Sequence, residues 1–269
     1  MSDESVDTTA LETVHFLSGS AYRYEILRAF VEQHSLTRQA VRERVDASRS
    51  TVRRTLEAFV GRGLIESVEG GYRLTATGEA LAEGVGSVLE LARITDEYEP
   101  LLRRLEPAVH GLDPTWLDGA SMTVSTETNP FGPAQRQTQT VREATTFRGF
   151  LPAIEIEGAK LVHERITAGQ LQAEIVVPSA MRETLTSQPF ASLFRDQLDT
   201  ERFECHIAPD GVPFYLGLAD DETTEIGVAD VDNIPRVLVQ STDTALRAWG
   251  DRVFEQYRRS ATRLDEIDR

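Results

Sequence analysis

Arginine and hydroxyl side chains gather in one stretch of the chain, residues 35–75. Between Ser35 and Gly63 lie seven arginines and three acidic residues. The planar guanidinium group of arginine can bond the O6 and N7 atoms of a guanine together, or clamp a phosphate. Serine and threonine hydroxyls can bond phosphate oxygens beside the amides of a helix N-terminus. The chemistry that these residue types offer is binding of a nucleic acid.

Two short amphipathic segments must position these side chains. Thr37 is the predicted N-cap of a helix that runs through Val45, and Ser48 is the predicted N-cap of the next helix. The second helix presents a polar face near its N-terminus, where recognition helices usually contact base edges. Its predicted buried stripe consists of Val52, Leu56, Phe59 and Val60. The predicted contacts with double-stranded DNA are Thr37, Arg38, Arg42, Ser48, Arg49, Ser50, Thr51, Arg53, Arg54, Tyr72 and Arg73.

A hairpin is predicted after the second helix. Residues 64–68 and 72–74 alternate around Glu69-Gly70-Gly71, a turn sequence that favours paired strands. Helix, turn, helix and hairpin in this order predict a winged helix-turn-helix, whose second helix can enter a major groove. Apolar residues at helical spacing in 11–17 and 22–31 predict two supporting helices. The alternative is that the charged face is only solvated, or docks another protein.

The charge of the whole chain opposes that of this stretch. The 269 residues carry a net charge of −16, whereas residues 35–63 carry +4, which leaves −20 for the rest. Lys160 is the only lysine. An acidic, lysine-poor surface resembles proteins of salt-loving archaea, in whose cytoplasm phosphate attraction would be heavily screened. Shape fit, hydrogen bonds and dimer geometry would then supply more of the affinity for DNA.

Other compositional features narrow the class of protein. No apolar run approaches the length of about 18 residues that spans a membrane, and the acidic N-terminus lacks the features of a secretory signal. The single cysteine, Cys205, excludes an intramolecular disulfide. We therefore expect a soluble, cytoplasmic protein without membrane contact.

A family resemblance rests on residues of the N-terminal pattern: Leu36-Thr37, Ser50-Thr51-Val52-Arg53-Arg54, Leu56, Gly63-Leu64-Ile65, Tyr72, Leu74-Thr75 and Gly78. With these residues the pattern resembles archaeal winged helix-turn-helix transcription regulators. The resemblance covers about the first 80 residues and says little about the operator.

Residues 77–105 form a predicted connector. Apolar positions three and four residues apart predict a long helix, or two helices with a break at Pro100. We interpret this segment as a dimerisation helix, because winged helix-turn-helix domains commonly dimerise so that their two recognition helices contact neighbouring half-sites on DNA. The alternative is that the stripe packs on its own domain. The predicted domains are a winged helix-turn-helix domain at residues 1–80, called the reader below, a connector at residues 81–105 and a C-terminal domain at residues 106–269.

The C-terminal part alternates predicted strands and helices, the pattern of an α/β domain. With the reader, this makes an α+β chain. The predicted strands are 121–125, 146–151, 172–177, 202–207, 214–219, 225–229 and 237–240. The predicted helices are 133–144, 159–166, 180–185 and a last one from residue 242.

No catalytic constellation stands out in the sequence. The five histidines show no metalloprotease spacing, and neither a nucleophile elbow nor a phosphate-binding loop is found. Cys205 and His206 are neighbours on a predicted strand, so their side chains point to opposite faces and Cys205 is interpreted as a buried thiol. The sequence therefore predicts a protein that is not an enzyme and that has no metal or cofactor.

A second resemblance rests on segments of the C-terminal part: Arg148–Pro152, Ala173–Pro178, Tyr215–Asp220, Trp249-Gly250, Phe254 and Tyr257. These segments resemble the sensor domain of methanogenesis-regulator-like proteins and, more distantly, of TrmB-type sugar-responsive regulators with a phospholipase-D-like effector domain. Phospholipase D chemistry needs His-x-Lys pairs, and Gly158 stands two positions before Lys160, so the resemblance implies a non-catalytic body.

Two functions remain open at this point. The first is a homodimeric, sequence-specific DNA-binding transcription regulator that responds to a small metabolite; the second has a C-terminal domain that only dimerises or docks a protein. Open α/β sheets bind ligands outside the carboxyl ends of their strands, and Arg148 could balance an anionic metabolite. The predicted effector-binding residues are Ser125, Thr126, Arg148, Pro152, Ser179 and Asp220.

Overall fold

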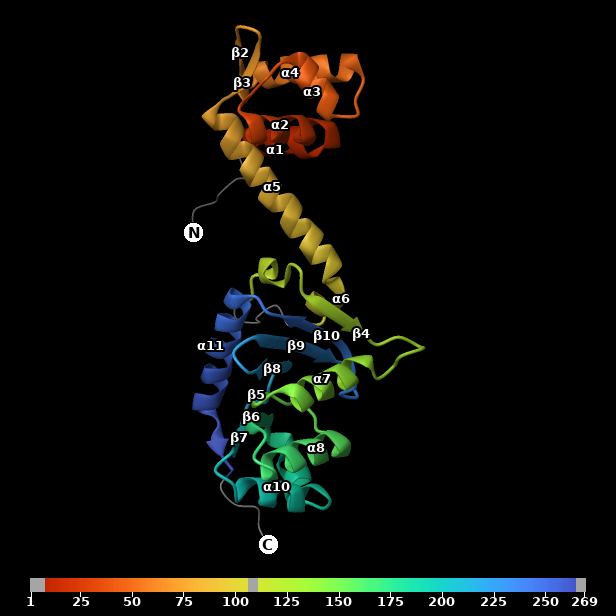
Figure 1. Cartoon of the computed structure of the whole chain (residues 1–269), viewed down its shortest axis with the longest axis vertical. Coiled ribbons are helices and arrows are strands. Elements are labelled where there is room, and N and C mark those ends of the chain that lie inside the picture. Colours follow the sequence, from red (N-terminus) through yellow and green to blue (C-terminus); the bar gives the residue numbers. More distant parts are fainter. Residues whose placement is uncertain (1–7, 106–110, 265–269) are drawn as a thin grey trace. The chain divides into compact units, whose positions relative to one another are not determined.

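The chain forms two compact units, which are described separately. The computed structural model describes residues 8–105 and 111–264 (Figure 1). The units are Met1–Arg93 and Ile94–Arg269, so they divide within the predicted connector. The fold class is confirmed: helices and a small sheet build the N-terminal unit, and a large sheet with helices builds the C-terminal unit.

The N-terminal unit has the helix, turn, helix and hairpin order that the sequence predicts. Its three strands pair antiparallel in the order β1-β3-β2. Strand β1 was not predicted, because two residues are too short to show alternation. The helices are α1 (Thr8–Ser18), α2 (Ala21–Gln33), α3 (Arg38–Arg44) and α4 (Arg49–Gly61), and the strands are β1 (Ser35–Leu36), β2 (Ile65–Val68) and β3 (Gly71–Leu74).

The core of this unit holds the second helix of the motif in place. Val52, Leu56 and Phe59 are fully buried, as the apolar stripe predicts. The prediction for Val60 is wrong, since this side chain is 38% exposed. On a helix of 3.6 residues per turn, each step of four residues drifts by about 40°, which carries Val60 off the stripe that begins at Val52. Thr55 takes the remaining inward position.

A long helix runs from the first unit into the residues of the second. Helix α5 spans Ala76–Glu97, and α6 spans Glu99–Leu102 with Pro100 in its first turn. The predicted break near Pro100 is confirmed, because proline fits the start of a helix but not its interior.

The apolar residues of these helices differ in their burial. Ala82 and Val85 belong to the N-terminal core, and Ile94 and Tyr98 belong to the C-terminal core. Between them Val88, Leu89 and Leu91 are exposed.

The C-terminal unit is built on a mixed sheet of eight strands within the described residues, in the order β11-β7-β6-β5-β8-β9-β10-β4. Strands β5, β6 and β7 are parallel, and every other neighbouring pair is antiparallel. The seven predicted strands are confirmed, with shifts of a few residues at their ends. The strands are β4 (Ser121–Val124), β5 (Thr146–Phe150), β6 (Gln172–Pro178), β7 (Phe203–Ala208), β8 (Tyr215–Ala219), β9 (Thr223–Ala229), β10 (Pro235–Ser241) and β11 (Thr262–Arg263).

Helices cover both faces of this sheet (Figure 1). On one face, Trp249 and Phe254 of α11 pack into a core with Phe150 of β5. On the other face, Phe194 of α10 and Ile166 of α8 pack over a second core. The helices are η1 (Pro114–Leu117), α7 (Gly132–Glu143), α8 (Ile156–Thr167), η2 (Ser179–Met181), α9 (Arg182–Thr186), α10 (Phe190–Leu198) and α11 (Thr244–Ser260).

Helix α10 was not predicted from the sequence. Its inward positions include Gln197, which is buried and interrupts the apolar spacing of Ala191 and Phe194. Of the helices in residues 8–105 and 111–264, none combines the length and the hydropathy that a membrane crossing requires.

Candidate nucleic-acid interface

Hydroxyl caps fix the two helices of the motif. The Thr37 hydroxyl accepts a hydrogen bond from the Ala40 amide at 3.1 Å, and the Ser48 hydroxyl accepts one from the Thr51 amide at 3.1 Å. Ser48 also lies 2.9 Å from the hydroxyl of Ser50. Both predicted caps are confirmed, so the first task of Thr37 and Ser48 is to satisfy helix amides. A phosphate oxygen that binds here would contact hydroxyl groups that already form hydrogen bonds within the protein.

Three arginines of the motif are exposed and have no ion-pair partner among the described residues. Arg49 and Arg54 lie on α4, and Arg42 lies on α3. Within the described residues, no acidic side chain forms an ion pair with any of the three. Their guanidinium groups can therefore meet a phosphate or a base edge without first leaving a protein partner.

Three other predicted contacts already have partners. Arg53 Nη1 lies 3.1 Å from Oε1 of Glu57, one turn along α4. Arg73 Nη2 of the hairpin lies 2.7 Å from Glu66 Oε1. Arg38 donates a hydrogen bond of 3.0 Å to the Tyr72 hydroxyl, which raises the pKa of Arg38 above its ordinary value. The hairpin is thus tied to the start of α3 through Tyr72 and Arg38.

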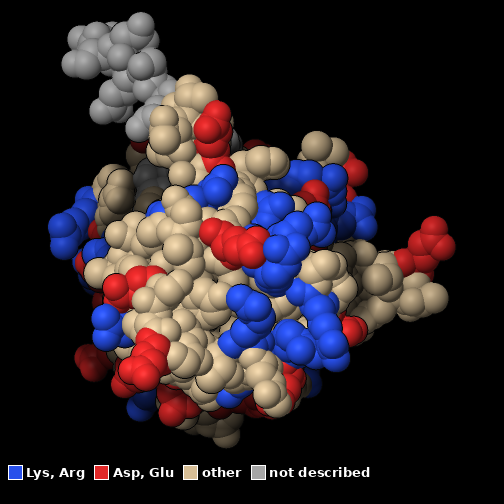
Figure 2. All heavy atoms as spheres, turned by 90° about the horizontal axis from the view of Figure 1, so that it is seen from above, with Lys and Arg blue, Asp and Glu red and all other residues tan. Residues whose placement is uncertain are grey.

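Other arginines of the N-terminal unit stabilise the fold instead. The guanidinium carbon of Arg62 lies 3.8 Å from the centre of the Phe16 ring, and that of Arg23 lies 4.5 Å from the same ring. Arg44 donates to the Ala40 carbonyl at 3.0 Å. Figure 2, a view onto the N-terminal unit, shows basic side chains grouped in one area of this face. The arginines of this unit therefore divide into those without an ion-pair partner among the described residues and those that stabilise the fold.

Close backbone packing orients the hairpin. A Cβ atom on Gly71 would lie 2.6 Å from the Leu36 carbonyl oxygen, so only glycine lets β3 approach β1 here. Gly70 at the tip has a φ of +84°, a conformation that glycine adopts without strain. The glycine pair that signalled a hairpin in the sequence therefore serves both the turn and the pairing with β1.

The predicted effector-binding residues do not come together. Ser125, Thr126, Pro152 and Ser179 follow β4, β5 and β6, whose carboxyl ends lie at one edge of the sheet. Asp220 lies at the opposite edge, because β8 runs antiparallel to β5. The expectation of a single strand-end site that includes Asp220 is therefore wrong.

The side chain of Asp220 has a structural role. Its Oδ1 accepts hydrogen bonds of 2.9 Å from the amides of both Thr145 and Thr146. Burial alone would raise the pKa of Asp220, but a hydrogen bond from the Thr145 hydroxyl, together with those from the two amides, outweighs burial and lowers the pKa. This carboxylate fastens the start of β5.

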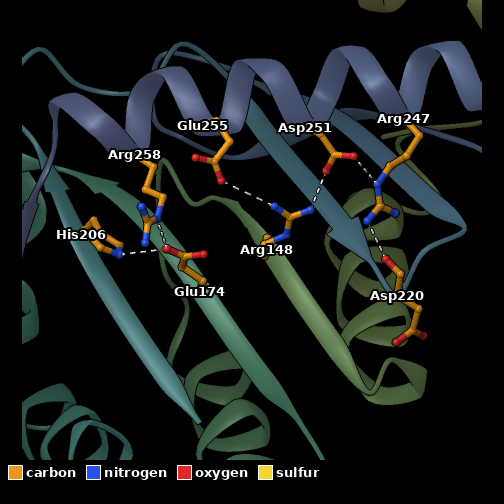
Figure 3. A network of polar contacts seen from close by, with 8 residues as sticks. All are labelled: Arg148, Glu174, His206, Asp220, Arg247, Asp251, Glu255 and Arg258. Carbon is orange, nitrogen blue, oxygen red and sulfur yellow. Dashed lines mark hydrogen bonds and ion pairs between the residues drawn. The ribbon is translucent and has the colours of Figure 1, made fainter. Parts of the chain in front are cut away.

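Arg148 also differs from the expectation. It lies in the middle of β5 and faces α11, where its Nη2 is 2.6 Å from Asp251 Oδ1 and its Nη1 is 3.8 Å from Glu255 Oε1 (Figure 3). Arg247 completes the row with a bond of 2.6 Å to the Asp220 carbonyl. The charge of Arg148 is thus neutralised within the protein.

A second ionic cluster lies further along the same face. His206 Nε2 lies 3.1 Å from Glu174 Oε1, and Arg258 of α11 pairs with the same oxygen (Figure 3). Hydrogen bonding to His206 and Arg258 overcomes partial burial and lowers the pKa of Glu174 to about 2. Ligand atoms of Glu174, Glu204 and His206 lie within 4.8 Å of one another, close enough for a metal. Since a guanidinium already occupies Glu174, the arrangement suits an ion-pair cluster rather than a cation site.

The cysteine is inert in this fold. Cys205 is fully buried on the face of β7 opposite to His206, and burial raises the pKa of its thiol to about 12. The prediction of a buried structural thiol is confirmed.

Comparison with protein families matches most of the chain. Residues 11–97 match the family model described as the HVO_A0261 N-terminal domain. Residues 130–260 match the middle domain of the methanogenesis regulatory protein FilR1. The resemblance to an archaeal regulator with a methanogenesis-regulator-like C-terminal part is confirmed. A search of curated proteins found no match.

Solved structures with similar folds are remote. TrmBL2, described as an archaeal chromatin protein, is 15% identical with a TM-score of 0.43, over 94% of this chain and 99% of that one. NucT from Helicobacter pylori is 11% identical with a TM-score of 0.41, over 54% of this chain and 98% of that one. The phospholipase D family member Nuc from Salmonella typhimurium is 10% identical with a TM-score of 0.43, over 55% of this chain and 99% of that one.

Proposed function

We propose that this chain is a DNA-binding transcription regulator of the methanogenesis-regulator type. In this proposal α4 enters the major groove of double-stranded DNA, and the hairpin of β2 and β3 contacts the neighbouring backbone. The C-terminal unit acts as a non-enzymatic body that controls the reader in response to a small metabolite.

One observation carries the proposal. Arg49 and Arg54 stand exposed near the N-terminus of α4 and, within the described residues, have no acidic partner. A surface arginine on a protein of net charge −16 would find many carboxylates to pair with, and most arginines of the C-terminal network do so. Unpaired arginines beside a capped helix N-terminus suit a negatively charged ligand.

A double substitution tests the reader. Binding sites are first selected by the full-length protein from a random-sequence duplex library, at high potassium chloride concentration. We expect Arg49→Ala/Arg54→Ala to weaken binding to the selected duplex by at least about 30-fold, since each base or phosphate contact of this kind is worth roughly 1–3 kcal/mol. Fluorescence anisotropy of the labelled duplex gives the affinities.

The matched control removes the same charge elsewhere. Arg28 and Arg93 are exposed and each lies beside a glutamate one turn away. Arg28→Ala/Arg93→Ala should change the affinity several-fold at most. Equal losses in the two double variants would reduce the effect to overall charge, and unchanged binding by Arg49→Ala/Arg54→Ala would refute the assignment of α4.

The proposed regulator is a homodimer, with α5 in the contact. Val88 is 59% exposed in the middle of α5, with Leu89 and Leu91 exposed beside it. An apolar stripe on a long helix favours pairing with a second helix. Two readers could then contact half-sites about one helical turn apart.

Charged substitutions test the dimer. Val88→Glu/Leu91→Glu should convert the protein from dimer to monomer in multi-angle light scattering at 1 M potassium chloride. Leu11→Glu, at an equally exposed apolar position of α1, is the control and should remain dimeric. A variant of α5 that stays dimeric would move the interface to another surface.

A C-terminal unit that only dimerises or docks a protein remains the second candidate function. This second function predicts that no small molecule binds the C-terminal unit. A regulator that responds to a metabolite instead needs a site whose affinity for the metabolite differs between two conformational states of the protein.

A further inference from the structure

A cavity of about 420 Å³ opens between the sheet and the helices on the face opposite to α11. This volume lies within the range of small-molecule sites. Its walls are mainly aromatic and aliphatic side chains from α8, α10 and the strands. Among the lining residues are Phe147, Leu151, Val162, Phe194, Phe203 and Tyr215. Such a surface favours a ligand that is mostly apolar.

Gln197, one of the residues that line the cavity, carries a buried amide without a hydrogen-bond partner among the described residues. The residue is 1% exposed, and neither its amide nitrogen nor its amide oxygen has a hydrogen-bond partner within the described part of the chain. The Tyr215 hydroxyl, the other deeply buried polar group of the wall, already donates to Glu225 at 2.8 Å. A buried amide without hydrogen-bond partners lowers the stability of the folded state. Its presence at an inward position of α10 therefore points to a ligand that supplies the missing hydrogen bond.

The charges at the cavity select against anions. The charged lining residues are Glu155 and Asp232, and no lysine, arginine or histidine stands among the described lining residues. Glu155 accepts hydrogen bonds from the amides of Glu157 and Gly158 and so caps α8. A carboxylate or phosphate ligand would therefore meet acidic groups without a countercharge.

Three lining segments follow strands at the same edge of the sheet. Phe131 lies after β4, Leu151 and residues 153–155 lie after β5, and residues 232–234 lie after β9. The carboxyl ends of these strands meet at one edge, where the sequence predicts a ligand site. None of the six predicted effector-binding residues lines the cavity, so the expected edge coincides with a different set of side chains.

We propose that this cavity binds an uncharged, mainly apolar small molecule whose carbonyl, amide or hydroxyl group hydrogen-bonds to Gln197. The proposal rests on the proposed function, because this molecule is the effector of the regulator. It replaces the anionic metabolite suggested by Arg148, whose charge is already paired with Asp251.

Nile red is a suitable probe, because it is neutral, apolar and carries a carbonyl group. Titrated into the full-length protein, it should bind at one site per chain with a rise in fluorescence. Ala134→Phe fills the cavity wall at α7 and should weaken binding at least tenfold. Ala180→Phe, the same substitution at an exposed position outside the lining, should bind as the parent does.

Gln197→Leu separates a binding role from a structural one. Leucine has a similar size and removes the unpartnered amide, so this variant should melt at a higher temperature than the parent. It should also bind Nile red several-fold more weakly, because the carbonyl of the probe loses its donor. A merely structural glutamine would change the melting temperature and leave the affinity for the probe unaltered.

The outcomes distinguish this inference from the proposed function. Absence of saturable binding, or binding that Ala134→Phe leaves intact, overturns the cavity site. Unaltered affinity in Gln197→Leu overturns the role of the amide. DNA affinity is measured on the same samples: a protein that binds its selected duplex but not the probe retains the reader and loses only the effector site.

Discussion

The N-terminal and C-terminal units use arginine in opposite ways. In the motif of α3 and α4, Arg42, Arg49 and Arg54 are exposed and lack an ion-pair partner among the described residues. On the face of the C-terminal sheet beneath α11, Arg148 and Arg258 are each paired with carboxylates of the protein (Figure 3). The same residue type thus lacks an ion-pair partner among the described residues of α3 and α4 and belongs to an internal ionic network in the C-terminal unit.

The role of a charged group therefore depends on its partner rather than on its residue type. An arginine that bonds Glu174 or Asp251 has already exchanged water for a protein carboxylate, so it offers little to an incoming anion. An unpaired arginine keeps its hydration until a phosphate or a base replaces it. Substitutions in the two units should therefore separate stability from DNA affinity.

The largest expected effect is on the stability of the C-terminal unit. Glu174→Gln removes the carboxylate that pairs with Arg258 and hydrogen-bonds to His206, and should lower the free energy of unfolding by about 2–3 kcal/mol at pH 7. Trp116 and Trp249, the two tryptophans of the chain, both lie in this unit, so tryptophan fluorescence during urea unfolding measures its stability. Arg49→Ala should leave this unfolding curve unchanged.

The dependence on pH checks the cause of that effect. The pKa of Glu174 falls from 4.5 to about 2 on folding, so its contribution is fully present above pH 4.5 and disappears as the pH falls towards 2. The difference in stability between the parent and Glu174→Gln should shrink over this range. A difference that stays constant from pH 7 to pH 2.5 would contradict an electrostatic role and indicate a packing defect.

Much of the fold could be predicted because it rests on local patterns. The caps Thr37 and Ser48, the glycines of the hairpin and the seven alternating strands each leave a periodic or positional signal in the sequence. Helix α10 left a weaker signal, because the buried Gln197 occupies an inward position. Gln197 thus interrupts the apolar spacing that predicts a helix, and its unpartnered amide is also the observation that favours a bound ligand.

The candidate sites could be predicted only in part, because a site depends on long-range pairing. The sequence identified the arginines of α4, but whether each has a partner depends on geometry. It assigned Asp220 to the same edge as Ser179, and only the antiparallel direction of β8 separates them. The cavity near Gln197 draws on segments more than 60 residues apart, which no local spacing reveals.

The smallest expected effect lies within the N-terminal unit, where a paired arginine and unpaired arginines stand on the same helix. Arg53 resembles the paired arginines, because Glu57 lies 3.1 Å from it on an exposed helix face. Such surface pairs contribute little to stability. Glu57→Gln should therefore free Arg53 and remove a repulsive charge near the DNA, which raises affinity about two- to fivefold with no change in unfolding. Glu32→Gln, which breaks the equivalent pair of Arg28 on α2, is the control and should not alter affinity. Anisotropy titrations would contradict this prediction if they showed no gain in affinity for Glu57→Gln, or an equal gain for Glu32→Gln. In that case the pairing of an exposed arginine does not limit its contact with DNA, and the arginines of the two units differ only in how deeply they are buried.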